Sequence, residues 1–206
     1  MTLWFLARSA GFVAVLAATL TVALGAAGTA SRGDARVLAQ LVHRSAAVLT
    51  LAMLALHAGL LVADHYVDVT PGGALLPFTA GYRGPALGLG TLAGYGFVVL
   101  ALTGALRGRM AASEAAARTW RGVHLTAYGA WVLAMAHGVL AGTDSGTPWA
   151  VLLYGGCATV VVGTVAARVI AGLAHADDPL PRARQGVRRP VQVPTTARRP
   201  LTGGTR

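Results

Sequence analysis

Five long apolar stretches without a charged side chain dominate the sequence. They cover residues 9–31, 45–63, 84–106, 122–143 and 145–167. Each is close to the roughly 20 residues that a helix needs to cross a hydrocarbon core about 30 Å thick. The stretches therefore predict an all-α fold, a bundle of five transmembrane helices in a multi-pass protein of the cell membrane, the bacterial inner or plasma membrane. We expect the second helix to begin earlier, near Val37, which leaves His43 at the headgroup boundary.

The composition excludes an ordinary soluble domain. Only 12% of the residues are charged and 55% are hydrophobic, whereas about a quarter of the residues of a soluble domain are charged. We predict one membrane domain over residues 1–173, because no other segment is long enough to bury a second core. Residues 174–206 are rich in arginine and proline and are expected to form a disordered cytoplasmic tail. No carboxylate lies within the five stretches, which argues against an ion pump or an ion-coupled transporter.

The basic residues indicate the orientation of the chain. With five spans, the first and third loops share one side of the membrane with the C-terminal tail, and this side carries most of the arginines. Basic residues favour the cytoplasmic side, so we expect the N-terminus outside and the C-terminus in the cytoplasm. The net charge of +10 then reflects orientation and attraction to anionic membrane lipid, and we expect no nucleic-acid partner.

Two pairs of histidines lie in these apolar segments, where ionisable groups are costly and therefore mark a functional site. His43 and His57 are 14 positions apart, and His124 and His137 are 13 apart. At about 100° per residue, the first two point to the same face of a helix, whereas the second two differ by about 140°. Unwinding or a kink near Gly129 resolves the mismatch, or else two cofactors approach the helix from different sides.

Chain direction decides how the histidines pair. The second and fourth spans run parallel, so His43 is expected level with His124 and His57 level with His137. Two neutral imidazoles from two helices suit haem iron, and we predict two bis-histidine b-type haems, one near each membrane face. The alternative is a non-catalytic protein that uses the histidines to bind a divalent metal for transport or sensing. Two separate sites would then be needed, because a separation of about 20 Å within each helix is too great for one mononuclear centre.

Arginines flank the ligand segments on the predicted cytoplasmic side. Arg44, Arg118 and Arg121 lie at the ends of the two segments. Their guanidinium groups could pair with the propionates of the inner haem, which makes Arg44 and Arg121 candidate cofactor-binding residues. Anchoring of the chain by the positive-inside rule explains the same arginines equally well.

The histidines and their neighbours resemble the ferric reductase transmembrane domain superfamily, which includes the membrane domains of NADPH oxidases, ferric reductases and the haem-bearing membrane subunit of bacterial methionine sulfoxide reductase. The matching residues are His43-Arg44 with His57, and Trp120-Arg121-Gly122-Val123-His124-Leu125-Thr126-Ala127-Tyr128 with His137. The resemblance covers roughly residues 10–173. It implies a dihaem cytochrome b, the electron-transfer subunit of an oxidoreductase, in which the first histidines of the two helices share one haem.

The chain departs from this family in two respects. Members commonly have six helices, whereas five are predicted here. The flavin and nicotinamide domain of the oxidases and ferric reductases is not matched, since only about 33 polar residues follow the last helix, without a G-x-G-x-x-G fingerprint. We therefore expect no flavin on this chain and a separate electron donor, either a flavoprotein, an FMN-binding redox partner or a quinol. The expected acceptor is ferric iron or a periplasmic redox partner.

Overall fold

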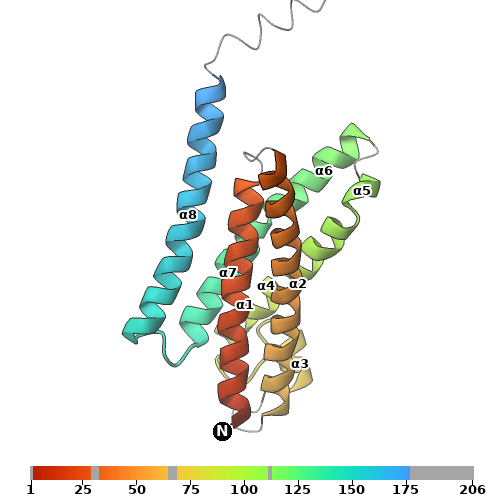
Figure 1. Cartoon of the computed structure of the whole chain (residues 1–206). Coiled ribbons are helices and arrows are strands. Elements are labelled where there is room, and N and C mark those ends of the chain that lie inside the picture. Colours follow the sequence, from red (N-terminus) through yellow and green to blue (C-terminus); the bar gives the residue numbers. More distant parts are fainter. Residues whose placement is uncertain (1, 29–32, 65–68, 111–112, 177–206) are drawn as a thin grey trace, which may run out of the picture. The chain divides into compact units, whose positions relative to one another are not determined.

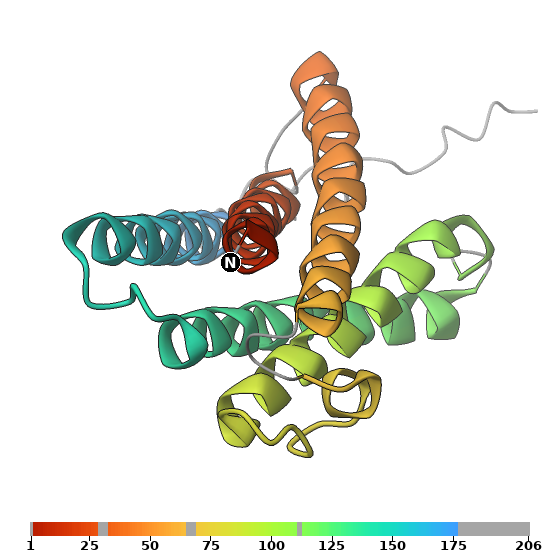
Figure 2. The same ribbon diagram turned by 90° about the horizontal axis from the view of Figure 1, so that it is seen from below.

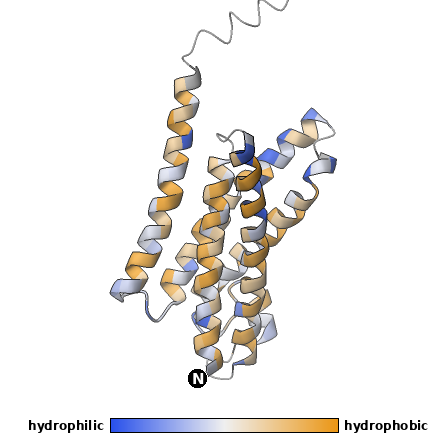
Figure 3. Ribbon diagram, viewed as in Figure 1, coloured by the Kyte–Doolittle hydropathy of each residue, from blue (hydrophilic) through white to orange (hydrophobic). Residues whose placement is uncertain are grey.

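The computed structural model describes residues 2–28, 33–64, 69–110 and 113–176, and these contain helices and loops without a strand. The helices are α1 (Thr2–Ala27), α2 (Gly33–Ala63), α3 (Pro71–Leu75), α4 (Gly84–Ala105), α5 (Arg107–Met110), α6 (Glu114–Leu125), α7 (Ala127–Ala141) and α8 (Pro148–Ala176) (Figure 1). Five segments are long and apolar enough to cross a membrane, namely α1, α2, α4, the joined α6–α7 and α8. Figure 3 shows apolar residues along most of these segments, whereas the α6 part carries several hydrophilic ones. The predicted all-α fold is confirmed for the described residues, with five helical segments long and apolar enough to cross a membrane.

The second helix differs from the prediction at its start. It begins at Gly33, four residues before Val37. His43 therefore lies about three turns inside the helix. Asp34 lies in the first turn of this helix. Its carboxylate favours the earlier start, because a negative charge is stabilising near a helix N-terminus.

The chain divides into a compact unit of residues 1–169 and a second unit of residues 170–206. Of the second unit, the structure describes only the last turns of α8. The predicted tail from residue 177 onward lies outside the described residues, so the boundary at residue 173 stays a prediction.

Two helix pairs form the compact unit. α1 packs mainly against α2, and α4 packs mainly against α7, as Figure 2 shows from below. Contacts of α1 with α7 and of α2 with α4 join the two pairs. Histidines lie on α2 in the first pair and on the α6–α7 segment, which includes α7 of the second pair. The contacts between the pairs therefore bring the two histidine-bearing segments together.

The fourth crossing is broken between its two histidines. Thr126 forms an irregular turn between α6 and α7. Its amide donates to the Val123 carbonyl oxygen at 3.1 Å, and its hydroxyl donates to the same oxygen at 2.6 Å. This is the tighter turn of a 3₁₀-helix, which often marks a functional irregularity within a helix. The break lies three residues before Gly129, where unwinding or a kink is one of the two predicted alternatives. The spacing of an ideal helix therefore does not apply to the two histidines.

A small core joins α1, α7 and the first part of α8. Its buried members are Ala18, Val22, Trp131, Cys157 and Val161. The Trp131 side chain is held by a hydrogen bond from its Nε1 to the Thr19 hydroxyl oxygen at 2.9 Å, and both side chains are buried. A buried indole needs such a partner for its N–H, so this bond fixes the position of α1 against α7.

Replacing Trp131 with phenylalanine tests this contact. The variant keeps an aromatic ring but loses the donor, and we expect a loss in the free energy of unfolding of about 0.6 to 1.7 kcal/mol, the range for hydrogen bonds between membrane helices. Unfolding of the detergent-solubilised protein would measure it. The matched change Thr19→Val removes the acceptor, so the double variant should cost little more than either single variant. Fully additive losses would show that the bond does not couple the two helices.

Candidate functional site

The four histidines come together in two pairs. The ring centres of His43 and His124 are 6.3 Å apart, and those of His57 and His137 are 6.1 Å apart. Each pair joins α2 to the fourth crossing, one ring from each. The structure thus brings each histidine of α2 to the partner that chain direction predicts.

The separation within each pair fits one metal ion between two rings. An imidazole nitrogen lies about 2.0 Å from a bound metal ion and about 1.2 Å from the centre of its own ring, so two imidazoles on opposite sides of one ion have centres about 6.4 Å apart. Both observed distances are close to this value. The rings are inclined to one another by 57° in the first pair and 77° in the second, an inclination that two independent axial ligands are free to adopt.

Three of the four rings are fixed by hydrogen bonds to carbonyl oxygens of neighbouring helices. Nδ1 of His57 lies 2.7 Å from the Ala7 oxygen, and Nδ1 of His43 lies 2.8 Å from the Thr21 oxygen. Nδ1 of His137 lies 2.9 Å from the Ala86 oxygen. A carbonyl only accepts, so each Nδ1 must carry the proton and donate it. Nε2 then keeps its lone pair, which is the tautomer that binds a metal through Nε2.

A glycine accompanies each of these carbonyl groups, four residues further along the same helix. The pairs are Ala7 with Gly11, Thr21 with Gly25, and Ala86 with Gly90. A Cβ atom on these three glycines would lie 3.1, 3.3 and 2.7 Å, respectively, from the nearest imidazole atom. The glycines therefore let the ring approach the helix backbone closely enough to reach the carbonyl. Each of these three histidines is held by a carbonyl and a glycine of another helix.

His124 is held differently from the other three. Its Nδ1 is buried and forms no hydrogen bond. Its ring stacks on Trp120, with ring centres 4.8 Å apart and an angle of 19° between the planes. The Trp120 Nε1 donates to the Thr103 carbonyl oxygen at 3.1 Å, and the Arg107 guanidinium lies 5.2 Å from the Trp120 ring centre. This histidine is thus positioned by stacking on an indole ring that also contacts a cation.

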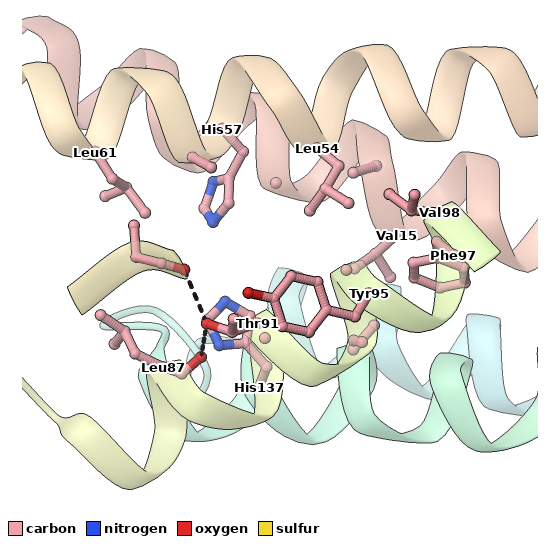
Figure 4. A pocket seen from close by; sticks show the side chains of 18 of the residues that line it. Val15, Leu54, His57, Leu61, Leu87, Thr91, Tyr95, Phe97, Val98 and His137 are labelled. Atoms are coloured by element: carbon pink, nitrogen blue, oxygen red, sulfur yellow. Dashed lines mark hydrogen bonds between the residues drawn. The ribbon is translucent and has the colours of Figure 1, made fainter. Parts of the chain in front are cut away.

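An apolar cavity of about 250 Å³ opens beside the pair formed by His57 and His137 (Figure 4). Residues of α1, α2, α3, α4 and α7 line it, and many of them are glycine or alanine. Apart from the two imidazoles, its polar lining side chains are Thr50, Thr91 and Tyr95. A cavity with small apolar walls and two facing imidazoles fits a flat apolar ligand that carries a metal ion.

The short helix α3 closes this cavity on one side. The Thr91 hydroxyl donates to the Ala74 carbonyl oxygen at 3.0 Å and to that of Leu87 at 3.3 Å, as Figure 4 shows. The Tyr95 hydroxyl donates to the Leu75 carbonyl oxygen. These bonds join the carbonyl end of α3 to α4, so α3 forms a wall of the cavity.

The predicted arginines lie on the surface. Arg44 and Arg121 are both exposed, and their pairing with propionates stays a prediction. The arginine beside the pair of His43 and His124 is instead Arg107, which contacts Trp120. On the other side of the protein, Arg83 donates to the carbonyl oxygens of Leu140 and Ala141 at 3.1 Å each and so caps the end of α7.

The glycines and the carbonyl groups are functional features that the histidine pattern alone does not reveal. One sequence signal could have identified them. Gly11 and Gly25 are 14 positions apart, as are Gly90 and Gly104, and this is the separation of His43 and His57. On the first of these helices the separation places Gly11 opposite His57 and Gly25 opposite His43, and on the other helix Gly90 lies opposite His137.

Comparison of the chain with protein-family models, with curated proteins and with solved structures finds no match. The function must therefore be argued from the geometry of the histidine pairs.

Proposed function

We propose that the chain is a membrane dihaem cytochrome b, which passes electrons across the bilayer between a separate donor and an acceptor. One observation carries this proposal. Two pairs of imidazoles, at two levels of the same helices, face one another at the separation that two axial ligands of one metal ion require.

The number of ligands favours haem over a metal ion bound by the protein alone. Within the described ranges, no group of three or more histidine, cysteine, aspartate or glutamate side chains is placed to hold a metal ion. A zinc site usually has three or four protein ligands, whereas each pair here offers two. Haem brings four in-plane nitrogen ligands of its own and needs only two axial ligands from the protein.

The residues of each site would have separate tasks. His57 and His137 would hold one haem, called the outer haem because this pair is predicted near the outer membrane face. His43 and His124 would hold the other, called the inner haem. The carbonyl groups that accept from Nδ1 raise the basicity of these ligands and fix the ring orientation. Bound haem supplies reversible one-electron transfer at each level. The two ligands of α2 are separated by about 21 Å along the helix axis, so the two levels together cover most of a hydrocarbon core about 30 Å thick.

The proposal needs a partner on each side of the electron transfer. The proposed donor is a separate flavoprotein, an FMN-binding redox partner or a quinol, and the proposed acceptor is ferric iron or a periplasmic redox partner. The part of the chain that the structure describes contains helices and short loops, and a Rossmann-type site requires a parallel sheet. The chain would thus act as the electron-transfer subunit of a ferric reductase-like oxidoreductase.

Purified protein tests the proposal directly. We expect a Soret band, a sharp α-band on reduction and about two haems per chain, as expected for bis-histidine b-type sites. In liposomes with ferricyanide inside, a reductant outside should reduce the trapped ferricyanide only when the protein is present, and His57→Ala should abolish this transfer. A folded, colourless protein that retains zinc would overturn the proposal and support the divalent-metal alternative.

A further inference from the structure

The unpartnered Nδ1 of His124 stands out against three ligands that are built alike. Each of the other rings donates to a carbonyl group, with a glycine four residues later on the same helix. His124 has a buried Nδ1 atom without a hydrogen bond. A buried donor or acceptor that is left unsatisfied is unfavourable, so a partner for this atom should exist in the working state.

The glycine spacing identifies where that partner lies. On α1, the glycines that face the two ligands of α2 are 14 positions apart, at Gly11 and Gly25. On α4, the glycine that faces His137 is Gly90, and 14 positions later is Gly104. The carbonyl group four residues before Gly104 belongs to Leu100.

The contacts between α4 and the fourth crossing place Leu100 at about the same level as His124 along the two segments. A Cβ atom on Gly96 would lie 2.8 Å from the Cβ atom of Ala130, and the Thr103 carbonyl accepts from Trp120. Because the two segments run antiparallel, residues between Gly96 and Thr103 on α4 face residues between Trp120 and Ala130. Leu100 and His124 are each within those intervals.

We infer that the carbonyl oxygen of Leu100 is the fourth anchor and that it accepts a hydrogen bond from Nδ1 of His124 across Gly104 when the inner site is loaded. This inference rests on the proposed function. The position of Gly104 is open, since a Cβ atom there would meet nothing within 4 Å. The Thr103 hydroxyl lies 3.1 Å from the Leu100 oxygen and 2.9 Å from the Val99 oxygen. It can therefore release the Leu100 oxygen and keep its hydrogen bond to Val99.

The turn at Thr126 allows the movement that this bond requires. His124 lies two residues before the break, at the end of α6. The irregular turn thus separates α6, which carries His124, from α7, which carries the anchored His137. Gly104 and Leu100 are positioning residues for the inner ligand and do not touch the metal.

Gly104→Val tests the inference, with Gly108→Val as the matched control. The two glycines are close in sequence, and a Cβ atom on either meets nothing within 4 Å in the structure. If only the present contacts mattered, the two variants would behave alike. If Leu100 anchors His124, only Gly104→Val should weaken retention of the inner haem, by about 10-fold or more, as for other groups that orient metal ligands. Retention of the outer haem reports that the variant is folded.

Two further measurements separate positioning from general stability. The low-spin electron paramagnetic resonance signal and the midpoint potential of the inner haem should change in Gly104→Val and stay unchanged in Gly108→Val. In the reduced wild-type protein, the Nδ1 proton of His124 should exchange with water as slowly as that of His43. Rapid exchange, or a Gly104→Val variant whose inner haem equals that of the control, would overturn this inference alone. A folded wild-type protein without haem would overturn the proposed function as well.

Discussion

Replacing His57 with alanine is expected to remove one haem and to leave the other in place. The ring of His57 faces only His137, at 6.1 Å, whereas His43 faces His124 at the other level. A single remaining imidazole cannot hold the outer haem in six-coordinate form, and we expect the content to fall from about two haems per chain to about one. Pyridine haemochrome analysis against protein concentration would measure this, with reduced spectra to identify the haem that remains.

The complementary variants provide the control. His137→Ala should reproduce the spectrum of His57→Ala, while His43→Ala and His124→Ala should give the other single-haem spectrum. Equal loss of both haems from every variant would contradict pairing by level. A double variant of His57 and His137 should lose no more haem than either single variant, because both changes act on the same site.

Gly90→Ala is expected to affect the outer site almost as strongly, although glycine carries no ligand atom. A Cβ atom there would lie 2.7 Å from Nδ1 of His137 and 2.8 Å from both Cε1 and Cγ of the same ring. The ring would have to move away and lose its bond to the Ala86 oxygen. Changes to groups that orient a metal ligand typically cost about 10- to 100-fold in affinity, and retention of the outer haem should fall by such a factor.

Gly94→Ala is the matched control for this prediction. It lies one turn further along α4, also lines the cavity, and its Cβ atom would make an ordinary contact of 3.5 Å with Leu54. Alanine is favoured over glycine within a helix, so Gly94→Ala should be neutral or slightly stabilising, with both haems retained. Loss of the outer haem from both variants alike would show that α4 tolerates no added volume, and it would contradict a specific role for Gly90.

The architecture could be predicted from the sequence because the membrane leaves few options. Charge-free stretches of bilayer length determine the number of crossings, and all five are observed as helices. The ends were less predictable. The second helix extends back to Gly33 because a charged first turn is compatible with a helix outside the hydrocarbon region, and apolar character alone does not detect this. The turn at Thr126 was expected near Gly129, since glycine is the usual signal for irregularity, whereas the threonine hydroxyl stabilises it by its bond to Val123.

The pairing of the histidines was also predictable. The number of spans determines the direction of each helix, and this direction determines the depth of each histidine in the membrane. The groups that orient them were not. Backbone carbonyl groups carry no sequence signature, and Gly90 resembles any small residue that lets membrane helices approach closely. Trp120 and Arg107 lie on separate helices, and only the fold brings the cation to the ring that stacks on His124.

The acceptors for His43 and His57 both belong to α1, which precedes α2 in the chain. The hairpin of α1 and α2 therefore contains both of its ligands together with the carbonyl groups that orient them. It precedes the partner ligands on α6 and α7 in the order of synthesis.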